Sequence, residues 1–109
     1  MKKILIPLLL LIFVLAGCGS SAAAKPDYTT KQFEAALNKG ENLEGKTVSV
    51  KVSKLVPNSA FGYNIEAGKH LNFVSDDNPN VKKGDKIVVK VKKIKSALGS
   101  FIITYKKES

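Results

Sequence analysis

Few residues of this 109-residue chain carry side chains that could perform covalent or metal chemistry. There is one Cys, one His and no Arg. A single thiol excludes intramolecular disulfides, and one Cys with one His excludes the clusters that hold structural metals. No nucleophile-elbow glycine pattern surrounds any Ser, so His70 has no evident partner for a catalytic triad. We therefore expect His70 to be a solvated surface residue and the protein not to be an enzyme.

The acidic segment Asp76-Asp77-Asn78 is the other candidate for chemistry. Its oxygens could ligate Ca²⁺, but the segment lacks the Gly and the terminal Glu of an EF-hand loop. A solvated turn fits the pattern better. We expect neither a metal nor a cofactor.

The lone thiol lies at the end of a targeting pattern. A basic start, residues 1–3, precedes an apolar run over residues 4–16 that contains Pro7. That run would rise about 20 Å as a helix, which is short of the roughly 30 Å hydrocarbon core of a bilayer. The pattern is typical of a secretory signal. The next residues, Leu15-Ala16-Gly17-Cys18, resemble the lipobox of bacterial lipoproteins.

The lipobox resemblance implies cleavage before Cys18 and transfer of a diacylglyceryl group to its sulfur. Two acyl chains, of palmitate type, would hold the chain stably in the membrane at about 0.8 kcal/mol per buried CH₂. The implied location is the extracytoplasmic face of the cell membrane. The alternative is an uncleaved signal anchor followed by an ordinary free Cys. We therefore divide the chain into a signal peptide (1–17), a lipidated Cys with a flexible tether (18–27) and a folded domain (28–107).

Charge is concentrated in one part of the mature chain. Removing residues 1–17 takes two Lys from the net charge of +9 and leaves +7. The segment 82–95 is the most basic, and Asp85 is its only acid; its lysines are Lys82, Lys83, Lys86, Lys90, Lys92, Lys93 and Lys95. Lys86, Lys90 and Lys92 would line the outer face of one strand. Lys93 breaks the alternation, which predicts either a bulge or the end of the inward face near Val91.

Such a lysine stripe would attract phosphates of nucleic acid, lipid headgroups or anionic wall polymers. The alternative is that these lysines only protect a strand edge and keep the domain soluble.

The pattern of the mature chain predicts one short helix followed by strands. Thr29 and Gln32 form a capping box, Tyr28 and Phe33 a hydrophobic staple, and Gly40 ends the helix. Alternating apolar residues then predict strands at 47–56, 61–65, 71–75, 86–95 and 100–106, with connections at 57–60 and 66–69 and a loop at 75–83. The fold class is mainly β, a five-stranded barrel preceded by one short N-terminal α-helix.

Two segments resemble small exported OB-fold domains of the tRNA-anticodon-binding-like group. Residues 43–52 (LEGKTVSVKV) resemble their opening strand, and residues 81–91 (VKKGDKIVVKV) resemble the start of their fourth strand. The resemblance covers residues 43–106 and implies an OB-fold-like barrel. Many OB folds carry a helix between strands three and four, where this chain has only a loop. The preceding helix could cap the barrel instead.

The aromatic residues decide what such a barrel could bind. Phe61, Tyr63 and Phe73 fall on the second and third strands, where OB folds usually bind, but their alternation favours the barrel interior. A core position would leave a polar groove lined by Asn64, Glu66, Asn72 and nearby lysines.

The sequence favours a monomeric, non-catalytic binding module of the bacterial surface. Its partner would be an anionic wall polymer or another surface protein. One alternative is an exported binder of single-stranded nucleic acid. A second is a lipoprotein that confers immunity or phage exclusion on its host.

Overall fold

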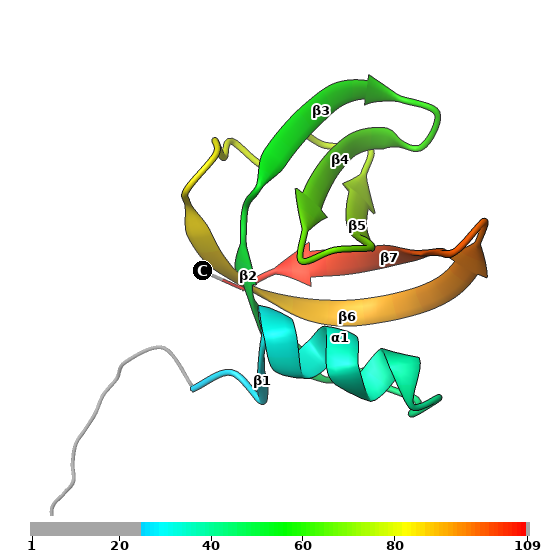
Figure 1. The fold of residues 1–109 in the computed structure, drawn as a ribbon. Coiled ribbons are helices and arrows are strands. Elements are labelled where there is room, and N and C mark those ends of the chain that lie inside the picture. The colour runs from blue at the N-terminus through cyan, green and yellow to red at the C-terminus, as the bar shows by residue number, and fades with distance from the viewer. Residues whose placement is uncertain (1–24, 109) are drawn as a thin grey trace, which may run out of the picture.

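The computed structural model describes residues 25–108, which form one short helix and seven strands (Figure 1). In chain order these are β1 (Tyr28–Thr29), α1 (Thr30–Asn38), β2 (Thr47–Lys51), β3 (Lys54–Ser59), β4 (Gly62–Ala67), β5 (Leu71–Ser75), β6 (Lys86–Ala97) and β7 (Ser100–Lys107). The prediction of a mainly β domain with one short helix is confirmed. The expected signal peptide and the lipobox residues Leu15, Ala16, Gly17 and Cys18 lie outside the described residues, as does most of the expected tether.

The seven strands form one open sheet in the order β1-β2-β6-β7-β5-β4-β3. The prediction of a closed, five-stranded barrel is therefore wrong in both closure and strand number. One additional strand is β1, which pairs with β2 in parallel through only two residues and is too short to leave an alternating pattern. The other arises because the strand expected over residues 47–56 is divided into β2 and β3.

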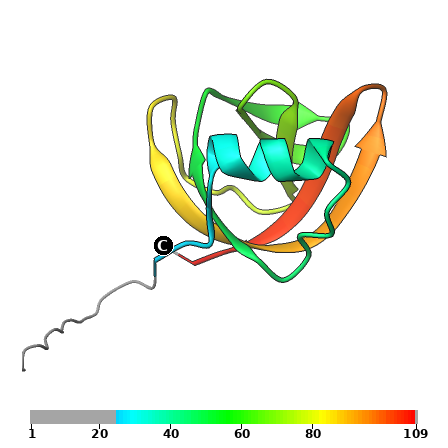
Figure 2. The same ribbon diagram turned by 60° about the horizontal axis from the view of Figure 1, so that its bottom comes forward.

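The division of that strand falls at Val52 and Ser53, where the backbone changes partners. The Val52 amide donates to the Asp85 carbonyl at 2.8 Å, and the Val52 carbonyl accepts from the Gly84 amide at 2.9 Å. One residue later, the Ser53 amide donates to the Glu66 carbonyl at 2.8 Å. The chain thus leaves its pairing with β6 and continues as β3, which pairs with β4 and forms the opposite edge of the sheet. The sheet is strongly curled (Figures 1 and 2).

Strand β3 runs further than the sequence pattern predicts. Pro57 was expected in a connection over residues 57–60, but β3 includes it and the turn begins at Ser59. Proline is compatible with β3 because β3 is an edge strand and its register with β4 shifts between Val56 and Ser59. The Ser59 hydroxyl then closes the turn by accepting from the Phe61 amide at 3.1 Å and donating to the Gly62 carbonyl at 2.6 Å.

Helix α1 begins and ends where its local signals predict. The Thr29 hydroxyl accepts from the Gln32 amide at 3.2 Å, and the Gln32 side chain accepts from the Thr29 amide at 3.0 Å, which completes the capping box. At the other end Gly40 has a φ of +85° and follows the C-cap residue. The amides of Gly40 and Glu41 donate back into the last turn, the arrangement of a Schellman motif.

The segment that leads into α1 is fixed by a reciprocal contact, which we call the Asp27–Thr47 latch. The Asp27 amide donates to the Thr47 hydroxyl at 2.9 Å. The Thr47 amide and hydroxyl donate to the Asp27 carboxylate at 3.0 and 3.2 Å. These bonds, chiefly the one from the Thr47 amide, hold the pKa of Asp27 below its usual value.

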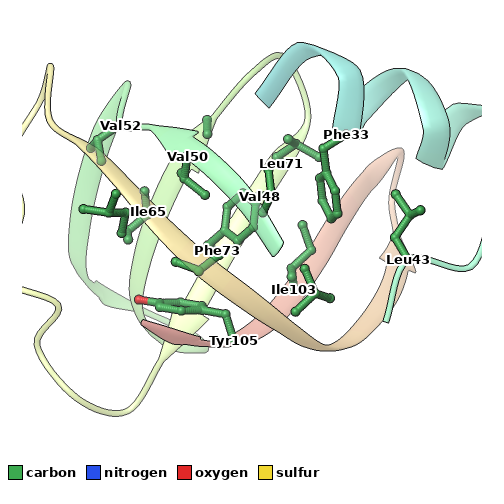
Figure 3. Close-up of a cluster of buried hydrophobic side chains, with 14 of the residues drawn as sticks. Phe33, Leu43, Val48, Val50, Val52, Ile65, Leu71, Phe73, Ile103 and Tyr105 are labelled. Atoms are coloured by element: carbon green, nitrogen blue, oxygen red, sulfur yellow. The ribbon is translucent and has the colours of Figure 1, made fainter. Parts of the chain in front are cut away.

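The core lies between α1 and the inner face of the curled sheet, and α1 lies across one end of that sheet (Figures 2 and 3). Phe33 on α1 is fully buried and contacts Phe73 with a centroid distance of 5.9 Å. Phe73 in turn meets Tyr105 at 6.1 Å in an edge-on arrangement. The predicted staple is also confirmed, since the rings of Tyr28 and Phe33 lie 6.2 Å apart. Such ring pairs contribute about 0.5–1.5 kcal/mol each beyond their area.

The three aromatic residues expected in the core do not share one environment. Phe73 is fully buried as predicted, and Tyr63 is half-buried. Phe61 is 54% exposed, so its prediction as a core residue is wrong. Although Phe61 has the same parity as the buried Ile65, it belongs to the β3–β4 turn, and β4 begins only at Gly62.

Candidate functional site

The basic segment 82–95 occupies strand β6 and the turn that precedes it. All seven of its lysines are exposed, as a lysine stripe requires: Lys82, Lys83, Lys86, Lys90, Lys92, Lys93 and Lys95. Ile87, Val89 and Val91 alternate with them and are buried.

The seven lysines do not form one continuous row. The register of β6 with β7 shifts between Val91 and Lys93, so of the two expected alternatives the strand has the bulge. Beyond the bulge, Lys93 pairs with Thr104 and Lys95 with Ile102, so both lie on the β6–β7 hairpin. Lys92 falls within the bulge instead of continuing the row of Lys86 and Lys90. Because Ile94 pairs with the buried Ile103, the shift returns Lys93 and Lys95 to the outer face that carries Lys86 and Lys90. Of the predicted row, only Lys92 is lost to the bulge.

Two further lysines, on the strands that flank β6, form a cluster with Lys86 and Lys90. In the antiparallel register, Lys51 of β2 lies opposite Lys86, and Lys106 of β7 lies opposite Lys90. All four are exposed. We call this cluster, made of Lys51, Lys86, Lys90 and Lys106, the lysine face. Its two additional members could be found only from strand register.

Within residues 25–108, no carboxylate forms an ion pair with the lysine face. Among residues 25–108 the one ion pair joins Lys82 to Asp85 at 3.4 Å, on the turn before β6. The Lys82 amide also donates to the Asp85 carboxylate at 3.0 Å, and this bond is the main cause of the lowered pKa of Asp85. Glu108 lies beside β6, because its amide donates to the Val88 carbonyl at 2.7 Å. Its carboxylate forms no ion pair within the described segment.

The polar groove predicted on β4 and β5 is occupied by side chains that bind one another. The Asn64 amide nitrogen donates to the Asn72 side-chain oxygen at 3.0 Å, and the Asn72 nitrogen donates to the Phe101 carbonyl at 3.2 Å. Glu66 pairs with Asn72 on one side and with Lys54 on the other. The three polar residues do lie together, and all are half-buried.

The candidates for catalysis and metal binding are exposed. His70 is solvated, as expected. Asp76, Asp77 and Asn78 are also exposed, and they make turn bonds: the Asp77 amide donates to the Ser75 hydroxyl at 3.0 Å and the Asn80 amide to the Asn78 side chain at 2.8 Å. In the part of the chain that the structure describes, no group of three or more His, Cys, Asp or Glu side chains converges on a point.

Comparison with known proteins adds no relative. No protein-family model matches the chain, and neither curated proteins nor solved structures give a significant match. Within residues 25–108, no helix has the length and apolar character needed to span a bilayer.

Proposed function

We propose that the protein is a membrane-anchored lipoprotein whose β domain is a non-catalytic binding module on the extracytoplasmic side. The anchor rests on the lipobox residues, with Cys18 as the acylated residue. The first element, β1, starts only about ten residues after Cys18. At 3.3–3.6 Å per residue, such a tether extends no more than about 35 Å, which keeps the domain close to the membrane.

The lysine face is the observation that supports a binding role. Like charges directly opposite one another in a sheet destabilise it, by roughly 0.2–1 kcal/mol per pair. The pairs Lys51–Lys86 and Lys90–Lys106 both incur this cost. A polyanion that contacts all four ammonium groups would reverse it. We therefore propose an anionic wall polymer, or an acidic surface of another envelope protein, as the partner.

A charge-reversal pair tests this role against a matched control. The variant Lys86→Glu/Lys90→Glu alters the lysine face, whereas Lys39→Glu/Lys54→Glu makes the same charge change at exposed lysines outside it. With long-chain inorganic polyphosphate as the probe, we expect wild type and control to bind with affinity that falls steeply between about 50 and 200 mM salt. The lysine-face variant should bind at least tenfold more weakly than the control.

Equal binding by the two variants would reject the lysine face as the binding surface. The anchor is tested separately by mass spectrometry of the mature N-terminus. An unmodified Cys18 would contradict the anchoring while leaving the polyphosphate result unaffected.

For the architecture, we propose an OB-fold-like, partly open barrel. Support comes from the pairing scheme, in which β2 and β3 act as one bent strand. The one parallel pair between long strands joins β5 to β7, and the remaining long strands pair antiparallel. Backbone bonds at Val52 and Ser53 link the two sides of the open sheet.

A second candidate function, binding of single-stranded nucleic acid, is favoured by the exposed Phe61. Phe61 and Lys92 line one cavity of about 290 Å³ beside β7. An aromatic ring and a cation that line one cavity can stack a base and attract its phosphate, and the stacking is worth about 1–3 kcal/mol per base. Asp76 and Asp77 line the same cavity and oppose this attraction. If this function holds, Phe61→Ala should weaken binding of a single-stranded oligonucleotide at least fivefold. Absence of binding by the wild type at low salt would reject it.

A further inference from the structure

A cavity of about 620 Å³ opens where α1 begins, and we call it the helix-end cavity. Its wall is mostly apolar, yet four lysines line it: Lys31, Lys51, Lys69 and Lys83. They come from four separate segments, namely α1, β2, the β4–β5 turn and the turn before β6. An apolar wall bordered by lysines is expected when the methylene stems lie along the wall and the ammonium groups reach the rim.

Hydrogen bonds to backbone groups hold three of these segments in place around the cavity. The Thr30 hydroxyl accepts from the Lys51 amide at 2.9 Å and donates to the Ser49 carbonyl at 2.7 Å, which ties the start of α1 to the end of β2. The turn before β6 is joined to the same point through Val52. The cavity is therefore built by the fold and does not depend on flexible side chains alone.

The one carboxylate in the wall offsets only one of the four lysine charges and forms no ion pair with these lysines. Glu34 is only 8% exposed, and its two oxygens accept from the amides of Lys69 and His70 at 2.9 and 2.8 Å. Both oxygens are thus occupied by backbone groups. The first turn of α1 contains no acidic residue either, so the positive end of the helix dipole adds to the lysine charge. The cavity presents a net positive rim around an apolar interior.

From these features we propose that the helix-end cavity binds the phosphate headgroup of an anionic phospholipid in the membrane that carries the anchor. A phosphate satisfies the ammonium groups at the rim, and the glycerol and first methylenes of the lipid meet the apolar wall. The inference rests on the anchoring proposed above, because the short tether keeps the domain within reach of headgroups. Lys51 belongs to both the cavity and the lysine face, so the bound lipid would also orient the lysine face relative to the bilayer.

The test uses the full mature lipoprotein in nanodiscs, with amine labelling of individual lysines read by mass spectrometry. Discs of phosphatidylcholine alone are compared with discs that contain phosphatidylglycerol. We expect labelling of Lys31, Lys69 and Lys83 to fall severalfold in the anionic discs, while labelling of Lys39, at the other end of α1, stays unchanged. The variant Lys31→Gln/Lys83→Gln should lose the protection of Lys69, since each lysine near the headgroup contributes about fivefold in affinity. The control variant Lys39→Gln should keep it.

The outcomes distinguish a membrane headgroup from a free phosphate, and they test the phosphate-binding cavity separately from the proposed anchoring. Equal labelling in both kinds of disc would overturn the inference. Equal protection by glycerol phosphate added to phosphatidylcholine discs would overturn the assignment to a membrane headgroup. A chain that fails to enter the discs contradicts the anchoring, and titration with glycerol phosphate in neutral detergent then decides whether the cavity binds phosphate. Absence of protection in that titration also overturns the inference.

Discussion

The contact between Glu34 and the β4–β5 turn predicts a measurable coupling between two residues far apart in sequence. The Glu34 carboxylate holds the amides of Lys69 and His70, and hydrogen bonds to a charged group contribute about 1.5–3 kcal/mol each. The two donors belong to exposed residues, so water can replace part of the loss. We therefore expect Glu34→Ala to lower the free energy of unfolding by about 3 kcal/mol.

Gly68 supplies the second half of the test. Its φ is +57°, and a Cβ there would overlap the Glu34 carboxylate oxygen. Gly68→Ala therefore incurs the backbone cost of about 1–2 kcal/mol for a left-handed residue and also displaces the carboxylate. In the Glu34→Ala background only the backbone cost remains. The double variant should thus be about 2 kcal/mol more stable than the sum of the single effects predicts.

Urea unfolding of the mature chain measures this cycle, with Gly45→Ala as the control. Gly45 has a φ of +86°, and a Cβ there would meet nothing within 4 Å. Gly45→Ala should therefore show the backbone cost alone, and its effect should add to that of Glu34→Ala. If the effects of Gly68→Ala and Glu34→Ala on the free energy of unfolding add within about 0.5 kcal/mol, the proposed contact is refuted. A decrease of less than about 0.5 kcal/mol for Glu34→Ala alone would refute it as well.

Three further predictions concern the latch, a hairpin turn and the lysine face. Because the pKa of Asp27 is lowered in the folded state, its stabilising effect is complete above its unfolded value of 3.8 and is lost as the pH falls through the folded value. Asp27→Asn should thus shift the urea midpoint at pH 7 and have a smaller effect near pH 2; a shift independent of pH would contradict this. Leu98 and Gly99 form the two-residue turn between β6 and β7, and Leu98 is fully exposed with a φ of +51°. Because Asn tolerates this backbone conformation better, Leu98→Asn should raise the free energy of unfolding by about 0.5–1 kcal/mol, measured as an increase in Tm. Lys90→Glu should also stabilise the fold, by about 0.2–1 kcal/mol, because it removes the repulsion from Lys106. A loss of stability in urea unfolding would show that the two ammonium groups do not repel each other.

The sequence predicted those features that depend on neighbouring residues. The capping box and the Gly40 terminus involve contacts within four residues, so the pattern of Thr29, Gln32 and Gly40 contained the necessary information. An irregularity near Val91, either a bulge or the end of the inward face, was predicted because Lys93 would otherwise share a face with the buried valines. In each case the pattern that carries the prediction lies within a few residues of the feature.

Features that depend on distant partners were missed. The break at Val52 and Ser53 is set by bonds to Asp85 and Glu66. The alternation of Val48, Val50 and Val52 ends at Lys54, but that pattern does not reveal the distant partners. Lys51 and Lys106 join the lysine face only because β2 and β7 flank β6, and no pattern within one segment reveals that register.

The Asp27–Thr47 latch also has a mechanical consequence. A domain that holds a partner while anchored at its N-terminal side is loaded between those two points, and the force enters the described chain at the latch and β1. Directly behind β1, the rings of Tyr28, Phe33 and Phe73 contact one another in sequence, the first pair edge-on and the second tilted, and lead into the core. A pull that detached β1 would therefore have to disturb a fully buried ring, so we expect resistance to extension at this end to depend on core packing as well as on the two-residue strand.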